Sequence, residues 1–305
     1  MKRGRVITRS WLSRRRADRT VASLAVIAMT LSGCGGGGGG SDGGGVTAVP
    51  PLTSGTPPPT PAPSPLPPAP FGLTADQSFA TIGWVQRSEQ EVVPATPEEL
   101  TFAWSESAKT YLATLPGYQP ARLIYTFPGN NPVAFSLVDK DGVQLTRGMA
   151  LHTLGNFSGI VNWFARSGSS YPAGSFAFGI PTAPGNIPGG RRTYDTPTQF
   201  ESGGGQLTFD AEARTLTGFI EVAWADAWGP YAPTRYPLTP SSPAAGSTSF
   251  AAKFDVPGAP TDGLVEGYFT GPQAAELILR WRAPIRSPYD DTWQVMYGVR
   301  YGRRQ

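Results

Sequence analysis

The sequence predicts an all-β fold in which many short antiparallel strands form a sandwich or a closed barrel. From Phe71 onward, apolar and polar residues alternate with a period of two, which indicates strands with one buried face. Gly, Pro, Asn and Asp interrupt the alternation at short intervals, as turns do. No long amphipathic helix is predicted. Closure of the sheet would remove the exposed edges that otherwise promote aggregation.

The first half of this region predicts strands separated by tight turns. They are expected at residues 100–104, 111–115, 123–127, 133–137 and 143–145. Asp141-Gly142 lies between the last two and supplies the positive φ that a hairpin turn needs. Asp139 and Asp141 also suggest a calcium loop, but the later ligands and the bidentate Glu of such a loop are missing. We therefore favour the hairpin.

The second half alternates more regularly. Strands are expected at residues 160–164, 176–180, 207–209, 216–224, 250–254, 264–269, 276–281 and 293–301. A membrane-spanning barrel would also alternate. Short, unevenly spaced strands and proline-rich loops, placed after a lipid anchor, favour a soluble barrel instead.

The N-terminal residues resemble an export signal. Residues 1–20 carry eight Lys and Arg residues and one acid, and residues 21–31 form a short apolar run. Such a run is too short to span a bilayer, which needs about 20 apolar residues, and the order of the two parts is that of a signal peptide. A buried core helix is the alternative, but it would not stand between a basic segment and a glycine run.

The stretch Leu31-Ser32-Gly33-Cys34 resembles the lipobox of bacterial lipoproteins. The resemblance implies cleavage before Cys34 and acylation of its sulfur, and usually a further acyl chain on the new amine. Two or three acyl chains anchor a protein stably, whereas one does not. We therefore expect a lipidated Cys34 that attaches the chain to a membrane.

The charge of the chain depends on its leader. The chain has 25 basic and 22 acidic residues, of which residues 1–20 hold eight and one. From Cys34 onward this leaves 17 basic and 21 acidic residues, a net charge of −4. The apparent basicity is therefore no argument for nucleic-acid binding. Cys34 is the only cysteine, so the fold must be held by its core instead of by disulfides.

A tether is expected between the lipid and the folded part. Residues 35–45 are nearly all glycine, and residues 46–70 contain eleven prolines. Neither segment can bury a core, so both are expected to be disordered. The glycine part would act as a flexible joint and the proline part as a semi-rigid spacer that rises about 3 Å per residue.

The sequence offers little for catalysis. His152 is the only histidine, which excludes metal sites built from several histidines and leaves one residue as base for a catalytic triad. A single histidine in a strand is more often structural. Two adjacent carboxylate pairs, Glu98-Glu99 and Asp290-Asp291, do not converge, because neighbours in a strand point to opposite faces. We expect no enzyme, no metal site and no cofactor of its own.

One late motif carries a family resemblance. Glu266-Gly267-Tyr268-Phe269-Thr270-Gly271-Pro272-Gln273-Ala274-Ala275-Glu276 resembles the hallmark of transferrin-binding protein B-like surface lipoproteins. Phe178-Gly179-Ile180-Pro181-Thr182 and the ending Val295-Met296-Tyr297-Gly298-Val299-Arg300 look like other strands of that family. The family usually continues with two glycines after the final Glu, where this chain has Leu277-Ile278, which permits a normal strand.

The resemblance implies an antiparallel eight-stranded soluble barrel preceded by a smaller strand-rich handle. The expected segments are a signal peptide at 1–33, the lipidated Cys34 and disordered Gly/Pro linker at 34–70, a handle-like subdomain at 71–157 and the barrel at 158–305. Gly267, Gly271 and Pro272 are expected to build the barrel. Glu276 is expected to need hydrogen bonds or Arg280 as a partner.

Ligand contacts are expected on loops, where binding residues concentrate. Residues 225–248 form the longest irregular stretch after the tether, and long loops are often functional. The candidates are Trp224, Trp228, Tyr231 and Tyr236, because Trp and Tyr are enriched at binding hot spots. The alternative is a loop whose aromatic residues only close the barrel end. A second candidate is the shorter loop at residues 283–291, with Arg286 and Tyr289.

The leading hypothesis is a non-enzymatic receptor anchored in the outer membrane at the cell surface. The resemblance implies a protein or haem-protein ligand of the iron-acquisition type, with an outer-membrane transporter or translocon as partner. The alternative is a structural or assembly lipoprotein of an outer-membrane complex. An enzyme built on a carboxylate pair is the least favoured of the three.

Overall fold

The structure, a computed structural model, describes residues 70–127, 133–165, 171–197, 203–223, 225–226, 229–230 and 232–305. The expected leader, Cys34 and nearly all of the tether lie outside the described residues, as do Trp224, Trp228 and Tyr231. In the part that is described, the two helices are single 3-10 turns, η2 (Pro70–Gly72) and η3 (Pro272–Ala274). None of its helices is long and apolar enough to cross a membrane.

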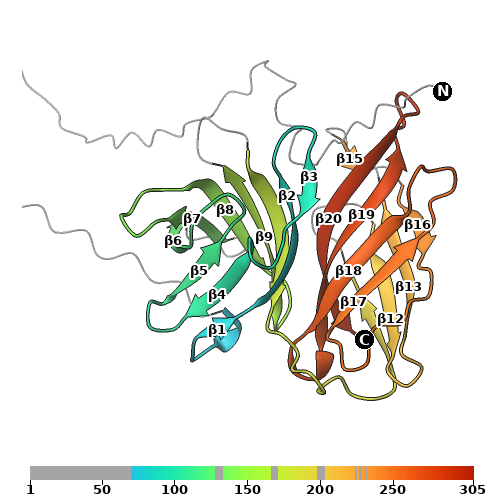
Figure 1. The fold of residues 1–305 in the computed structure, drawn as a ribbon, viewed down its shortest axis with the longest axis horizontal. Helices are drawn as coiled ribbons and strands as arrows, with labels where there is room; N and C mark the ends of the chain where they lie inside the picture. Colours follow the sequence, from blue (N-terminus) through green and yellow to red (C-terminus); the bar gives the residue numbers. More distant parts are fainter. Residues whose placement is uncertain are drawn as a thin grey trace, which may run out of the picture. The chain divides into compact units, whose positions relative to one another are not determined.

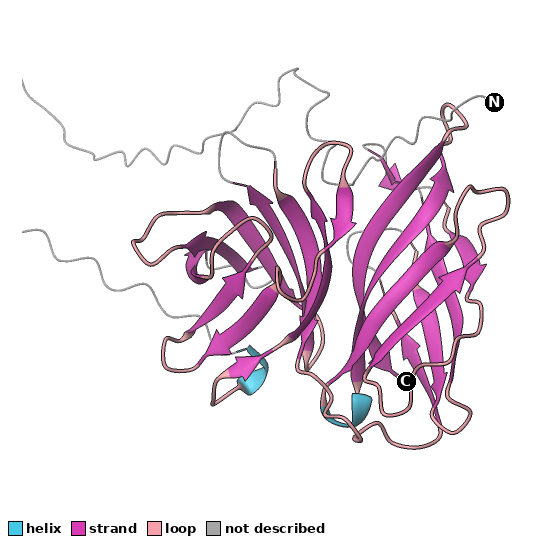
Figure 2. Ribbon diagram, viewed as in Figure 1, coloured by secondary structure: helices cyan, strands magenta, loops and turns pink. Residues whose placement is uncertain are grey.

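The prediction of an all-β fold is confirmed (Figures 1 and 2). The first antiparallel sheet has ten strands in the order β1-β4-β5-β6-β7-β8-β9-β10-β2-β3. Their bounds are β1 (Gln77–Ser78), β2 (Ala80–Gln86), β3 (Val92–Pro94), β4 (Thr101–Ser105), β5 (Thr110–Thr114), β6 (Ala121–Phe127), β7 (Val133–Val138), β8 (Thr146–Thr153), β9 (Ser158–Ala165) and β10 (Ala173–Gly179).

The extended segment from β1 to β2 takes part in two distant portions of this sheet. Gln77 and Ser78 pair with β4, whereas Ala80–Gln86 pair with β10. The curved sheet thereby folds around an aromatic core, in which Phe102 stacks on Tyr111 at 4.8 Å between ring centroids and meets Phe178 edge-on at the same distance. Aromatic pairs of this kind stabilise a core beyond the burial of their area.

The second sheet has eight antiparallel strands in the order β16-β13-β12-β11-β20-β19-β18-β17. Their bounds are β11 (Arg191–Asp195), β12 (Gly205–Asp210), β13 (Thr215–Val222), β16 (Thr234–Pro237), β17 (Ser249–Phe254), β18 (Gly263–Thr270), β19 (Glu276–Arg286) and β20 (Trp293–Arg304). A bridge between Leu238 and Phe254 joins its two ends, so the expected eight-stranded barrel is confirmed. Two short strands, β14 (Ala225–Asp226) and β15 (Gly229–Pro230), pair separately.

The barrel core is formed by the inward positions of its strands. Burial alternates along β17, where Phe250, Ala252 and Phe254 face inward. Trp281 and Phe269 are almost completely buried in the same cluster. A barrel of eight strands has an interior just wide enough for such side chains to fill.

The structure corrects the predicted boundary between the two parts. β9 and β10, which were expected in the barrel at 158–305, belong to the ten-stranded sheet. The chain leaves that sheet after Gly179 and enters the barrel at Arg191. The first part is therefore not a small handle. The strand period is the same in both sheets, so it cannot tell which sheet a strand joins.

Polar and apolar contacts join the two sheets. A small buried cluster contains Ile82 and Ile160 from the first sheet and Ile278 and Tyr301 from the barrel. The indole of Trp84 donates a hydrogen bond of 3.1 Å to the Gly298 carbonyl. Contacts between β2 and both β19 and β20 make the two sheets one unit.

The family-like motif shapes this junction. Glu276 accepts hydrogen bonds from the backbone amides of Asn156 and Phe157, at 2.7 and 3.1 Å. Arg280 pairs with Glu266 instead, at 2.8 Å. Glu276 therefore has hydrogen-bond partners, as expected, and they lie in the connection between β8 and β9 of the first sheet. β19 continues regularly through Leu277, as the absence of the usual glycines predicts.

Candidate binding surface at the loop end of the barrel

The predicted ligand loop is shorter than expected. Residues 234–237 form β16, which pairs with β13, so the prediction of an irregular stretch over 225–248 is wrong there. Tyr236 lies on this strand, and its ring stacks on Phe254 at 5.6 Å between centroids. The prolines around this strand hid its pattern. That Trp224, Trp228, Tyr231 and Tyr236 contact a ligand stays a prediction.

The connections after β13, β17 and β19 lie at one end of the barrel, because antiparallel neighbours turn at alternate ends. Their described residues are 223, 225–226, 229–230 and 232–233 after β13, 255–262 after β17, and 287–292 after β19. We call this the loop end. The backbone of Gly258 lies beside the Trp293 ring, so the second and third connections are neighbours.

The third connection forms the tip of the longest hairpin, β19–β20, drawn in red in Figure 1. The Ser287 amide donates to the Thr292 carbonyl at 2.8 Å. The Thr292 hydroxyl donates to the Asp290 carboxylate, also at 2.8 Å. Arg286 forms an ion pair with Asp291. These bonds close a six-residue turn and fix its shape.

Tyr289 projects from this tip. Its side chain is 63% exposed, the highest value among the large apolar residues that the structure describes. Beside it, the Arg286 guanidinium lies over the Trp293 ring at 5.9 Å. An exposed aromatic side chain on a fixed turn loses little conformational entropy when it binds a partner. The second candidate loop of the sequence therefore has a shape fixed by hydrogen bonds.

A hollow of about 380 Å³ lies on the outer barrel wall just below the loop end. It is lined by Lys253 on β17, Leu264 on β18 and Arg282 on β19, together with residues 260–263. The three side chains are cross-strand neighbours in one row. Leu264 thus forms an apolar floor between two cations.

A second hollow, of about 410 Å³, lies further along the same wall, where β2 meets the barrel. Its lining includes Ile82, Ser249, Glu266 and Arg280. Arg280 is only 15% exposed and is held by Glu266 at 2.8 Å. It also donates to the carbonyls of Gly83 and Ala95, at 3.2 and 3.3 Å. Arg280 is therefore bound within the fold, which favours a structural role.

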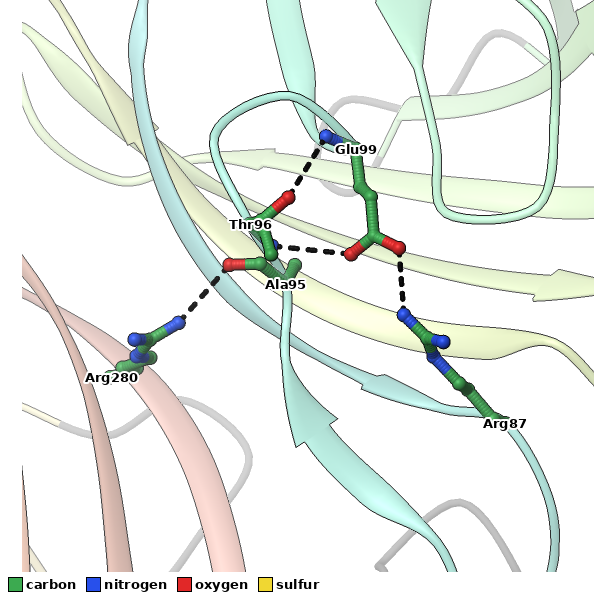
Figure 3. A network of polar contacts seen from close by, with 5 residues as sticks. All are labelled: Arg87, Ala95, Thr96, Glu99 and Arg280. Atoms are coloured by element: carbon green, nitrogen blue, oxygen red, sulfur yellow. Dashed lines mark hydrogen bonds and ion pairs between the residues drawn. The ribbon is translucent and has the colours of Figure 1, made fainter.

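Figure 3 shows how this contact continues into the first sheet. Ala95 precedes Thr96, whose hydroxyl accepts a hydrogen bond of 3.3 Å from the Glu99 amide. The Glu99 carboxylate accepts one of 2.7 Å from Arg87. The network holds the turn between β3 and β4 in the position where the Ala95 carbonyl can meet Arg280.

Solved structures of transferrin binding protein B (TbpB) resemble this chain. A mutant of the vaccine antigen TbpB from Haemophilus parasuis Hp5 is 10% identical over 75% of this chain and 76% of that chain, with a TM-score of 0.35. Intact Ap-TbpB, with N and C lobes, is 12% identical over 76% and 78%, with a TM-score of 0.33. Isotype 1 TbpB from serogroup B Neisseria meningitidis is 12% identical over 75% and 52%, with a TM-score of 0.34.

The likeness concerns the fold alone. No protein-family model matches the chain, and no curated protein matches it.

The titratable residues singled out in the sequence lie in strands and turns of the fold. His152 is buried on β8, and its burial lowers its pKa. Hydrogen bonds from Ser287 and Thr292 lower the pKa of Asp290. Asp139 accepts bonds from the Asp141 and Val143 amides, at 2.9 and 2.8 Å, which is the predicted hairpin. Among the described residues, no cluster of His, Cys, Asp and Glu is suited to hold a metal ion.

Sequence reasoning missed the hollow beside Arg282. Lys253, Leu264 and Arg282 are separated by turns of different length, so no local pattern joins them. Their outward positions follow from the alternation of each strand. The register that aligns them was not predictable without the β17–β18 and β18–β19 pairings.

Proposed function

We propose that this chain is a lipid-anchored lipoprotein of the outer membrane that binds a protein ligand at the loop end of its barrel, without catalysis. The observation that carries the proposal is Tyr289, exposed on a hydrogen-bonded tip. The Leu31-Ser32-Gly33-Cys34 stretch supports the anchor. The likeness of residues 266–276 to the hallmark of TbpB-like lipoproteins supports the role of a receptor.

The finer parts of the proposal follow from that sequence resemblance. The ligand is a protein that carries iron or haem, and an outer-membrane transporter or translocon is the partner. In this proposal the lipid on Cys34 and the expected tether hold the folded part away from the bilayer, and the folded part faces the cell surface. The candidates Trp224, Trp228, Tyr231 and Tyr236 belong to the same proposal, because Trp and Tyr are the residue types enriched at binding hot spots.

The anchor is tested with the full chain produced in a Gram-negative bacterium. We expect radiolabelled palmitate to enter the wild type and not Cys34→Ala, because the thioether forms on the Cys34 sulfur. Wild-type protein should sediment with membranes and be cut by protease added to intact cells. Equal labelling of both chains would contradict lipidation at Cys34, and protection from protease would place the protein inside the cell.

Ligand binding is tested by capture from culture-medium and cell-surface proteins on the full chain in detergent. Tyr289→Ala should reduce retention of the captured protein about tenfold or more, as for an aromatic hot spot. It should change the free energy of unfolding by less than about 0.5 kcal/mol, since the side chain is exposed.

The matched control for this capture is Leu112→Ala, which removes a 44% exposed side chain from the first sheet. Visible absorbance of the retained fraction reports iron or haem. If Tyr289→Ala and Leu112→Ala retain the ligand equally, the tip that carries Tyr289 is not part of the binding site. Retention of outer-membrane components alone would favour an assembly role.

A further inference from the structure

The hollow below the loop end has a charge imbalance. Lys253 forms a long ion pair of 3.4 Å with Asp262. Two further carboxylates on or next to these strands are engaged, Glu266 by Arg280 and Asp291 by Arg286. Among the described residues, Arg282 therefore has no ion-pair partner, although its side chain is exposed at the rim of the hollow.

The surroundings of Arg282 define which group fits. Its guanidinium is a planar fork that suits a carboxylate in two parallel hydrogen bonds. Tyr297 is its cross-strand neighbour on β20. Burial raises the pKa of Tyr297, and the positive charge of Arg282 acts in the other direction and lowers it. Leu264 lies between Arg282 and Lys253. A side chain with a short apolar part that ends in a carboxylate fits this site, because its apolar part can contact Leu264 while its carboxylate meets a cation.

Resting on the function proposed above, we propose that this hollow receives a glutamate side chain of the protein ligand. The two side-chain methylene groups of this glutamate lie on Leu264. Its carboxylate binds Arg282, and Lys253 is the second cation. From Cys34 onward the chain carries a net charge of −4, so a local pair of cations differs from the average surface and favours an acidic segment of the ligand.

The hollow and the tip form one surface. Arg282 and Arg286 are both exposed and lie on the same face of β19, with the buried Pro284 between them, so they are about 14 Å apart at the usual rise of a strand. Tyr289 follows directly. A ligand segment of a few residues can therefore place an aromatic contact at the tip and a carboxylate in the hollow, which gives the acidic residue a defined distance from the hot spot.

The test uses methyl NMR of leucine-labelled full chain in detergent micelles. The probe is an acetylated, amidated pentapeptide of glycine and serine with glutamate at its centre. We expect a saturable shift of the Leu264 methyl signals, and at least about fivefold weaker binding to Arg282→Gln, as loss of a charge-assisted pair implies. Arg122→Gln, which removes an exposed arginine from β6, is the matched control and should bind as the wild type does.

Three results would overturn the proposal. They are an equal shift with glutamine at the centre of the peptide, the same shift with inorganic phosphate alone, and unchanged binding to Arg282→Gln. None of these results would change the capture experiment, in which the wild type retains the ligand and Tyr289→Ala does not. Failure of this inference is therefore distinguishable from failure of the receptor function.

Discussion

Tyr194 shows how single polar side chains are held inside the barrel. Its ring is fully buried, and its hydroxyl donates a hydrogen bond of 2.8 Å to the Ala274 carbonyl in η3. A buried hydroxyl is tolerated when it has such a partner. The bond fixes η3, and with it the start of β19.

The buried hydroxyl predicts a loss of stability in alkali. Burial raises the pKa of Tyr194 to about 12, although the charges of Arg192 and Arg304 act to lower it. An exposed tyrosine ionises near pH 10. The unfolded chain therefore loses its proton first. The contribution of Tyr194 is complete below about pH 10 and falls by up to about 3 kcal/mol as the pH rises through 12.

Urea unfolding between pH 8 and 11.5 measures this effect. Tyr194→Phe keeps the ring and removes the ionising group, so its stability should decline less steeply with pH than that of the wild type. Identical slopes for the two proteins would show that Tyr194 is not the group responsible.

At the scale of the element, the motif of residues 266–276 works through close approach of β18 to its neighbours. A Cβ atom at Gly267 would lie 2.3 Å from the Ile278 carbonyl oxygen and 2.4 Å from the Phe250 ring. Neither a backbone oxygen nor a packed ring can move away easily. Gly267 is therefore required by the space between β17, β18 and β19.

Gly267→Ala should destabilise the protein by about 2–4 kcal/mol, since overpacking forces shifts of backbone and core. The control is Gly189→Ala, where a Cβ atom meets nothing within 4 Å. Thermal and urea unfolding of both variants provide the measurement. A Gly267→Ala protein as stable as the control would mean that the strands can move apart without cost.

Strand positions were predictable from the sequence because the alternation of apolar and polar residues is a property of neighbouring residues. Leu100, Phe102 and Trp104, for example, lie in and next to β4 as expected. The membership of β9 was not predictable, because Ile160 and Trp163 would be equally well buried in either sheet. β16 was missed because Pro237 stands at its end, where proline argues against a strand.

At the scale of the whole molecule, the two sheets are coupled by hydrogen bonds that side chains of one make to the backbone of the other. Glu276 is 3% exposed and meets two amides of the chain between β8 and β9. Trp84 meets the Gly298 carbonyl. When such a hydrogen bond breaks in a buried place, its donor and acceptor are left without partners. Separation of the two sheets therefore costs free energy.

Glu276→Gln should therefore lower the free energy of unfolding by about 1–3 kcal/mol, because one of its two acceptor oxygens becomes an amide that faces a backbone N–H. Amide hydrogen exchange should accelerate equally in β9 and β20. The exposed Glu212→Gln is the control. Faster exchange in β9 alone would show that the two sheets open independently.

The candidate surface was less predictable than the fold. Tyr236 and Tyr289 are both tyrosines near prolines in polar stretches, and only the tertiary structure shows that one packs on Phe254 and the other projects from a fixed turn. The bonds that fix that turn join residues close in sequence, whereas the row of Lys253, Leu264 and Arg282 depends on register between distant strands.

The path of the chain from β1 into β2 has a mechanical consequence. A pull from the N-terminal side would first load the short pairing of β1 with β4 and then run along β2, whose ladder to β10 spans residues 80–86. Those hydrogen bonds lie across the pulling direction, so traction loads them together in shear and does not peel them one after another. The bond from Trp84 to Gly298 passes part of the load to the barrel. Under the proposed function, in which the chain is anchored on its N-terminal side, this arrangement would resist drag on a bound ligand without opening the loop end.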